Sequence, residues 1–148
     1  MITIDQSNQY LEELEDELSN APKFKVDLST EWINTFSTKA GVYAVYQGQA
    51  MIYIGETGCI RKRMNDLRNT MNHTLRRLLG EKMFSTRSDY KRASSTQKYS
   101  PEIESELEKW MCQNLQISSI PVSLGRKELE ERITSTNLQL LNKRTKRK

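Results

Sequence analysis

The chain has 148 residues, a net charge of +4 and 28% charged residues, which suits one domain with a core that needs no disulfide or structural metal. Its two cysteines, Cys59 and Cys112, stand in no CxxC or Cys/His spacing, so the sequence encodes no zinc site. The first residues have no secretory pattern, and no apolar run approaches the roughly 20 residues of a membrane span, so we expect a cytoplasmic protein without a membrane segment.

Charge is unevenly distributed along the chain. Residues 1–35 hold eight acidic and two basic residues, a net charge of −6, which leaves +10 for residues 36–148. Such a basic region favours a polyanionic partner, nucleic acid first. The alternative is a basic surface that is merely solvated.

The N-terminal part predicts helix first and is ambiguous afterwards. Residues 8–19 place Tyr10, Leu11, Leu14 and Leu18 at helical spacing around an acidic face, and Pro22 predicts a stop soon after. Residues 24–28 alternate like a short strand. Ser29 is a candidate cap for a turn of helix that carries three apolar residues, Trp32, Ile33 and Phe36.

The next segment predicts a β-hairpin followed by two helices. Residues 41–48 and 50–56 are rich in β-branched and aromatic residues and flank a Gln-Gly-Gln turn. Residues 59–69 resume at helical period. A second helix covers residues 73–83 and starts near Thr70 or Asn72 as its cap.

The last third predicts a loop, a helix, a strand and a final helical segment. Residues 85–100 have few apolar residues, which predicts a flexible basic loop. Ser100-Pro101 then opens a helix, and residues 116–124 form a strand in which Pro121 indicates an edge or irregular position. We expect residues 126–142 to be helical with an uncertain end, and the basic tail to be disordered.

Five separated pieces carry a family resemblance. Residues 41–43 read Gly-Val-Tyr and residues 53–55 read Tyr-Ile-Gly, and Arg63 stands ten positions after Tyr53. Glu130 and Asn142 follow at a spacing of twelve. In this order the pieces resemble the GIY-YIG nuclease superfamily over roughly residues 40–142. One triplet alone is a weak signal, whereas five pieces in order are a strong one.

The resemblance implies a fold and a domain organisation. We expect an α+β fold with a small three-stranded, largely antiparallel sheet flanked by helices. Residues 1–36 form an acidic, partly helical N-terminal extension, and residues 37–142 form the GIY-YIG-like nuclease domain with an insertion at 84–116. Residues 143–148 form the basic tail.

The resemblance also implies metal-dependent cleavage of DNA, with RNA not excluded, by an endonuclease that uses one divalent ion, Mg²⁺ or Mn²⁺. Phosphodiester hydrolysis needs an activated water and charge neutralisation. The expected roles are Tyr43 as general base, Tyr53 as positioner of phosphate or water, Arg63 as electrostatic stabiliser, Glu130 as metal ligand and Asn142 as an orienting or phosphate contact. Which tyrosine is the base stays open.

The hairpin explains why two tyrosines would serve one site. Residues of like parity face the same side of a strand, and partners across a hairpin lie about 5 Å apart. Tyr43 and Tyr53 are therefore expected to meet near the start of the helix that bears Arg63. Gly55 permits close approach of the backbone there.

Several residues leave alternatives open. Glu56 stands where many members carry lysine or serine, and we expect it to point away from the site; a second acid near the metal is the alternative. Glu128 and Glu131 are rivals of Glu130 as the ligand. The expected contacts to nucleic acid are His73, Arg76, Arg77, Arg87, Lys91, Arg92 and Lys98, with Tyr90 and Tyr99 available to stack on bases.

Two other functions stay open. The chain is alternatively a binding module for nucleic acid that lacks cleavage, or a protein-interaction domain on the same fold. Its specificity requires its own loop at 85–100, a partner protein or a second copy in a homodimer.

Overall fold

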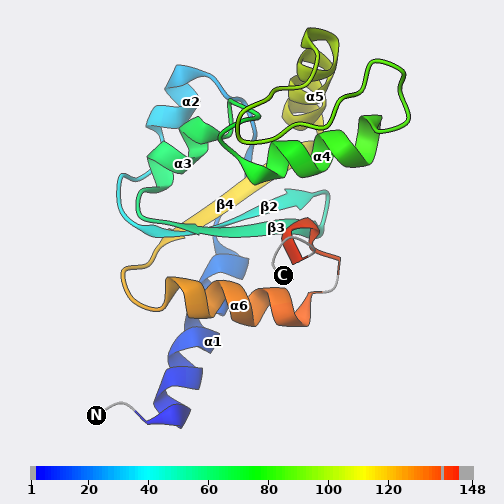
Figure 1. The fold of residues 1–148 in the computed structure, drawn as a ribbon. Coiled ribbons are helices and arrows are strands. Elements are labelled where there is room, and N and C mark those ends of the chain that lie inside the picture. Colours follow the sequence, from blue (N-terminus) through cyan, green and yellow to red (C-terminus); the bar gives the residue numbers. More distant parts are fainter. Residues whose placement is uncertain (1–2, 138, 144–148) are drawn as a thin grey trace.

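The computed structural model describes residues 3–137 and 139–143. Figure 1 shows the elements in chain order. They are α1 (Ile4–Asn20), β1 (Phe24–Lys25), α2 (Thr30–Asn34), β2 (Gly41–Gln47), β3 (Ala50–Thr57), α3 (Ile60–Asp66), α4 (Thr74–Phe84), α5 (Pro101–Asn114), β4 (Leu115–Pro121), α6 (Arg126–Thr136) and the 3₁₀ turn η1 (Leu141–Lys143).

The centre of the fold is an antiparallel sheet in the order β1-β4-β2-β3. The described residues thus form four strands, where three were expected; the α+β class with a largely antiparallel sheet is confirmed. The fourth strand is β1, whose Phe24 pairs with Ile117 of β4. Pro121 ends β4, beyond the two residues that β1 covers, so its missing N–H disrupts no ladder on that side.

Helices cover both faces of the sheet (Figure 1). Strand alternation sends Tyr43, Val45 and Tyr53 to the face covered by α2, α3, α4 and α5. The intervening residues, such as Ala44 and Ile54, pack with α1 and α6 on the other face. β3 is an edge strand, and the layers meet around its open side, where α6 and η1 both lie against it.

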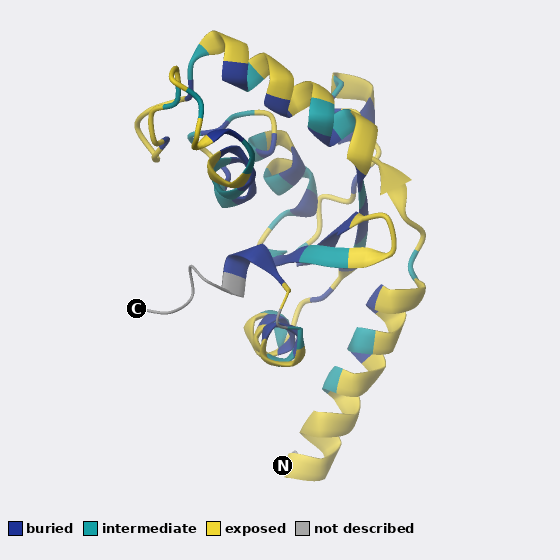
Figure 2. Cartoon of the chain, turned by 90° about the vertical axis from the view of Figure 1, so that its right-hand side faces the viewer, coloured by how far each residue is buried: buried dark blue, intermediate teal, exposed yellow. Residues whose placement is uncertain are grey.

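α1 begins earlier than residue 8, because Thr3 and Gln6 form a capping box. Its C-terminal half packs through Leu14 and Leu18, whereas its N-terminal half projects from the body and is exposed (Figure 2). Residues 24–36, whose sequence is ambiguous, form both a strand and a helix. The strand β1 precedes α2, and the Ser29 hydroxyl caps α2. Residues 24–36 therefore belong to the sheet and core.

Two helix boundaries differ from expectation. His73 caps α4, in place of Thr70 or Asn72. The final helical segment breaks after α6, where the Asn137 side chain donates to the Ile133 carbonyl at 2.7 Å. Ser100 caps α5 with Pro101 in its first turn, as predicted. Residues 144–148 of the predicted tail lie outside the described residues. In the part of the chain that is described, no helix is both long and apolar enough to cross a membrane.

Candidate active site

The hairpin brings two phenols together. Tyr43 of β2 pairs with Gly55 of β3, and Tyr53 lies on the same face with its ring centroid 6.3 Å from that of Tyr43. Both rings are buried. A Cβ atom at position 55 would overlap the Tyr43 ring, so this close approach requires glycine. The two tyrosines therefore lie together on one face of the hairpin, as strand alternation predicts.

Arg63 reaches this pair from α3. Its Nε donates to Tyr43 Oη at 3.3 Å, and its Nη1 donates to the carbonyl of Asn72 at 3.0 Å and to Asp66 at 3.4 Å. No hydrogen bond among the described residues involves Nη2, and the side chain is 26% exposed. The guanidinium thus spans a buried phenol and solvent, which suits binding of an anion at its outer edge.

His73 contacts the same phenol oxygen. Its Nδ1 accepts the Leu75 N–H at 3.1 Å, and its Nε2 lies 2.9 Å from Tyr43 Oη. Burial, and then the positive charge of Arg63, lower the pKa of His73 well below its usual value, so the ring is neutral near pH 7. A neutral ring that accepts at Nδ1 carries its proton on Nε2, which therefore donates to Tyr43.

Tyr43 Oη consequently accepts two N–H groups, and its own proton is directed elsewhere. Burial raises the pKa of Tyr43, and the neighbouring Tyr53 raises it further, whereas Arg63 lowers it. Burial likewise raises the pKa of Tyr53. Both groups are neutral phenols at pH 7. The phenolate form of either needs more positive charge than these contacts provide.

Glu130 approaches from the opposite layer. α6 places its side chain, which is 8% exposed, close enough to the tyrosines for its carboxylate to raise the pKa of both phenols. Its rivals Glu128 and Glu131 are exposed. The structure therefore brings the Glu130 carboxylate close to the hairpin tyrosines, which Arg63 contacts from the other side.

Glu130 fits a magnesium-like ion. Such ions prefer hard oxygen ligands and keep several of their waters, so one carboxylate is sufficient. Among residues 3–137 and 139–143, no group of three or more His, Cys, Asp or Glu side chains is placed to hold a metal. The donor set thus suits a hydrated oxygen-binding ion and does not suit zinc.

Asn142 lies in η1 and is buried. Its Nδ2 donates to the Ile54 carbonyl on the open side of β3 at 2.6 Å. This bond covers part of an edge strand and holds η1 against the sheet. The Asn142 side chain therefore anchors η1 to β3. Any orienting effect of Asn142 on the site would act through this contact with the backbone.

Glu56 forms an ion pair with Arg126 at 3.1 Å. It pairs with Val42 in the ladder and so lies on the opposite face from the tyrosines, the face that α6 covers. Arg126 precedes Glu130 by four residues on α6. The ion pair thus ties β3 to the helix that carries the carboxylate.

The predicted contacts to nucleic acid fall into separate groups. Arg76 is 2% exposed and pairs with Glu104 at 2.8 Å, and His73 is fully buried, so a structural contact replaces the predicted phosphate contact of each. Arg87 pairs with Asp89 and Glu106. Lys91, Arg92 and Lys98 are exposed, and Arg77 is half-buried against backbone carbonyls.

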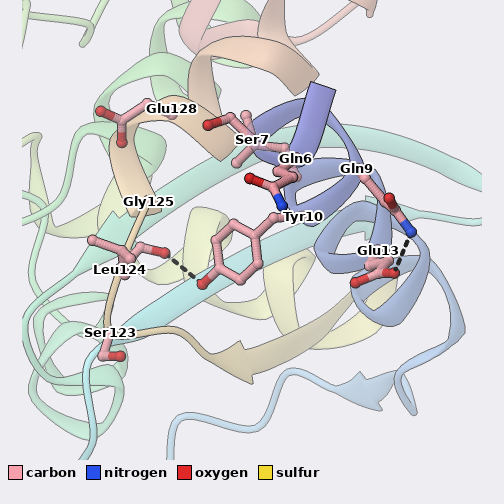
Figure 3. Close-up of a pocket in the computed structure, with 10 residues that line it drawn as sticks. Gln6, Ser7, Gln9, Tyr10, Glu13, Ser123, Leu124, Gly125 and Glu128 are labelled. Carbon is pink, nitrogen blue, oxygen red and sulfur yellow. Dashed lines mark hydrogen bonds between the residues drawn. The ribbon is translucent and has the colours of Figure 1, made fainter. Parts of the chain in front are cut away.

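A cavity of about 840 Å³ lies elsewhere, between α1 and the loop before α6 (Figure 3). Tyr10 Oη donates to the Leu124 carbonyl there at 2.8 Å, and Glu128 lies at its rim. Its lining residues do not include Tyr43, Tyr53, Arg63 or Glu130. It is separate from the candidate active site.

The fold and the site define a class of protein. It is a small α+β domain in which a hairpin, the following helix and a later helix assemble a polar site at a sheet edge. A family model described as the GIY-YIG catalytic domain matches residues 11–148, and the chain belongs to this family of nuclease domains. No curated protein and no solved structure is similar enough to match the chain.

The buried His73 predicts a pH dependence of stability. It is the only histidine in the chain. Because its folded pKa is lowered, the unfolded chain binds the extra proton below about pH 6.5, and stability falls as the pH decreases. Between pH 7.5 and 5.5 we expect a loss of about 1 kcal/mol in the free energy of unfolding, measured by denaturant titration.

His73→Asn is the matched variant, since asparagine also caps helices. We expect its stability to be nearly constant over that pH window. An equal pH slope in wild type and variant would show that His73 is not the titrating group.

Proposed function

We propose that this protein is a metal-dependent endonuclease that hydrolyses phosphodiester bonds in DNA. The supporting observation is the 3.3 Å contact between Arg63 Nε and Tyr43 Oη, with Glu130 near the same phenols. A cation, a proton acceptor and a metal-binding carboxylate are the groups that this reaction needs. Membership of the GIY-YIG family supports the same reaction.

Glu130 would hold the divalent ion, Mg²⁺ or Mn²⁺. When bound, the ion would supply positive charge for a phosphate oxygen and for the phenolate form of Tyr43. Arg63 Nη2 binds a second phosphate oxygen, because its other nitrogens are held by Tyr43, Asp66 and Asn72. The phosphate is thereby fixed between the two layers.

The phenolate form of Tyr43, which arises when the phenol proton leaves to solvent, accepts a proton at Oη from the attacking water, whose oxygen then bonds to phosphorus. The P–O bond to the departing nucleotide breaks, and its sugar oxygen takes a proton from solvent. His73 Nε2–H and Arg63 Nε–H stay on Tyr43 Oη and orient its free lone pair toward the water. Tyr53 positions the water or the phosphate, and Asn142 positions η1 beside β3.

The rest of the basic surface would guide the DNA backbone. Residues 36–148 carry a net charge of +10, and three cations of the segment after α4, Lys91, Arg92 and Lys98, are exposed. Contacts of this kind make affinity fall as salt rises and carry little sequence information. Binding should therefore weaken steeply between low and physiological salt.

Incubation with supercoiled, branched and single-stranded DNA tests the proposal. We expect wild type to nick at least one of these substrates with Mg²⁺ and none of them in EDTA. Arg63→Ala should lower the cleavage rate by about 10²–10³-fold, as loss of one donor to a developing charge does in other enzymes. Gel retardation in EDTA should show that the variant still binds DNA.

Each other outcome points to another function. Salt-dependent retardation without nicking by wild type would make the protein a binding module. Absence of both nicking and retardation would favour a protein-interaction domain. Nicking that is equal in wild type and Arg63→Ala would contradict the role given to this guanidinium.

A further inference from the structure

The segment between α4 and α5 is held firmly against α4, although its sequence predicts a flexible loop. Tyr99 Oη donates to the Arg77 carbonyl at 2.6 Å, and the Tyr99 N–H donates to Glu104 at 2.9 Å. A Cβ atom at Gly80 would overlap the Tyr99 ring, so this ring lies directly on the helix backbone. Ala93 and Tyr99 are buried. The segment is therefore anchored through these two residues and forms a wall along α4.

A cavity of about 280 Å³ lies between this wall and α4. The rings of Tyr90 and Tyr99 border it, with centroids 5.6 Å apart and planes inclined by 34°. Glu81, Arg77 and Arg92 supply its charged groups. Its volume is near the lower limit of ligand pockets, which suits one flat ring system better than an extended ligand.

The cavity lies beside the candidate active site. Thr74 and Arg77 line it, and the residue before Thr74 is His73, which contacts Tyr43. One turn of α4 spans about 5.4 Å, and successive nucleotides of one strand rise by about 3.4 Å. The near end of the cavity, at Thr74, is thus on the order of one or two nucleotide rises along α4 from His73, the residue that contacts Tyr43.

We propose that this cavity is a subsite for one unpaired nucleobase of the DNA strand, next to the phosphate that is cleaved. The proposal rests on the endonuclease function above and adds a substrate class to it, DNA with an unpaired or displaced base. A base inside a paired duplex cannot enter a side pocket unless it leaves the stack, and an already unpaired base does so at the lowest cost.

The lining matches the chemistry of a base. The ring of Tyr90, which is only partly buried, offers a stacking surface, and base–aromatic stacking tolerates any base. The Glu81 carboxylate accepts hydrogen bonds from an exocyclic amino group, which cytosine and adenine have and thymine lacks. The exposed Arg92 can hold the adjoining phosphate.

Binding in EDTA tests the subsite without cleavage. The probes are a duplex with one unpaired 2-aminopurine and the same duplex fully paired, followed by fluorescence and anisotropy. Tyr90→Ala should weaken binding of the first duplex by about tenfold and leave that of the second nearly unchanged. Tyr90→Phe should keep the wild-type affinity, and Tyr10→Ala, a tyrosine on the projecting α1, is the matched control.

A second variant does not depend on the packing of Tyr90. Glu81 is exposed, so Glu81→Ala should fold, and it should remove the preference of wild type for unpaired cytosine over unpaired thymine. Equal loss on both duplexes in Tyr90→Ala, or no loss on either, would overturn the subsite, as would a base preference that Glu81→Ala retains. Selective binding by a wild type that never nicks would instead overturn the endonuclease.

Discussion

Glu130→Gln is expected to lower the rate of DNA cleavage by about 10³-fold or more. The substitution preserves the shape of the side chain and removes the carboxylate that would hold the divalent ion. A metal contributes several kcal/mol of transition-state stabilisation, and each 1.4 kcal/mol is a factor of ten in rate. Single-turnover cleavage with saturating enzyme measures this effect, and calorimetric titration with Mn²⁺ should show that ion binding is lost too.

Glu131→Gln is the matched control on the same helix. Glu131 is exposed, whereas Glu130 is 8% exposed and its carboxylate raises the pKa of both Tyr43 and Tyr53. We expect the control to cleave and to bind Mn²⁺ as wild type does. Wild-type binding of Mn²⁺ by Glu130→Gln would remove the ligand role from this residue, whatever the cleavage rate.

The sequence predicts the hairpin part of the site well, because local rules govern it. Alternation along β2 and β3 is enough to place Tyr43 and Tyr53 on one face, and the glycine opposite Tyr43 leaves room for the ring. Arg63 follows on the next helix, so few residues separate it from the hairpin. Short separations leave few alternative arrangements.

Glu130 was predicted by family resemblance, and its position in space depends on long-range packing. α6 belongs to the opposite layer and reaches the phenols only because β3 is an edge strand. The sequence also indicates a short strand around β1, but not its pairing with the distant β4, so the sheet was expected to have three strands instead of four. Periodicity within a segment contains no information on either pairing.

His73 and Arg76 show where inference from residue type fails. Arg76 is cationic and His73 is polar, and both stand in a basic stretch of sequence. Residues of these types in such a stretch indicate contacts to phosphate at the surface. Their partners are 30 and 28 residues away, at Tyr43 and Glu104, and become visible only once α4 is packed. The sequence likewise points to the better-known capping residues Thr70 and Asn72 for α4, whereas in the structure the Nδ1 of the neutral His73 accepts the capping N–H.

Tyr43→Phe is expected to reduce cleavage by about 10²–10⁴-fold, the range for loss of a general base. The variant removes only Oη, so the ring still packs over Gly55, but His73 and Arg63 lose an acceptor. A buried donor without its partner costs about 1–3 kcal/mol, so a thermal melt should show a lower midpoint with folding retained. Single-turnover rates measure the catalytic loss.

Tyr53→Phe separates the two phenols, because it removes a hydroxyl from the same buried face. We expect a smaller loss of rate there, and a rate that still rises with pH, since burial raises the pKa of Tyr43 and more base forms as the pH increases. In Tyr43→Phe that rise should disappear. If instead Tyr53→Phe lost both the rate and its rise with pH while Tyr43→Phe kept them, the general base would be Tyr53, and the two N–H donors on Tyr43 would serve only to hold its ring beside it.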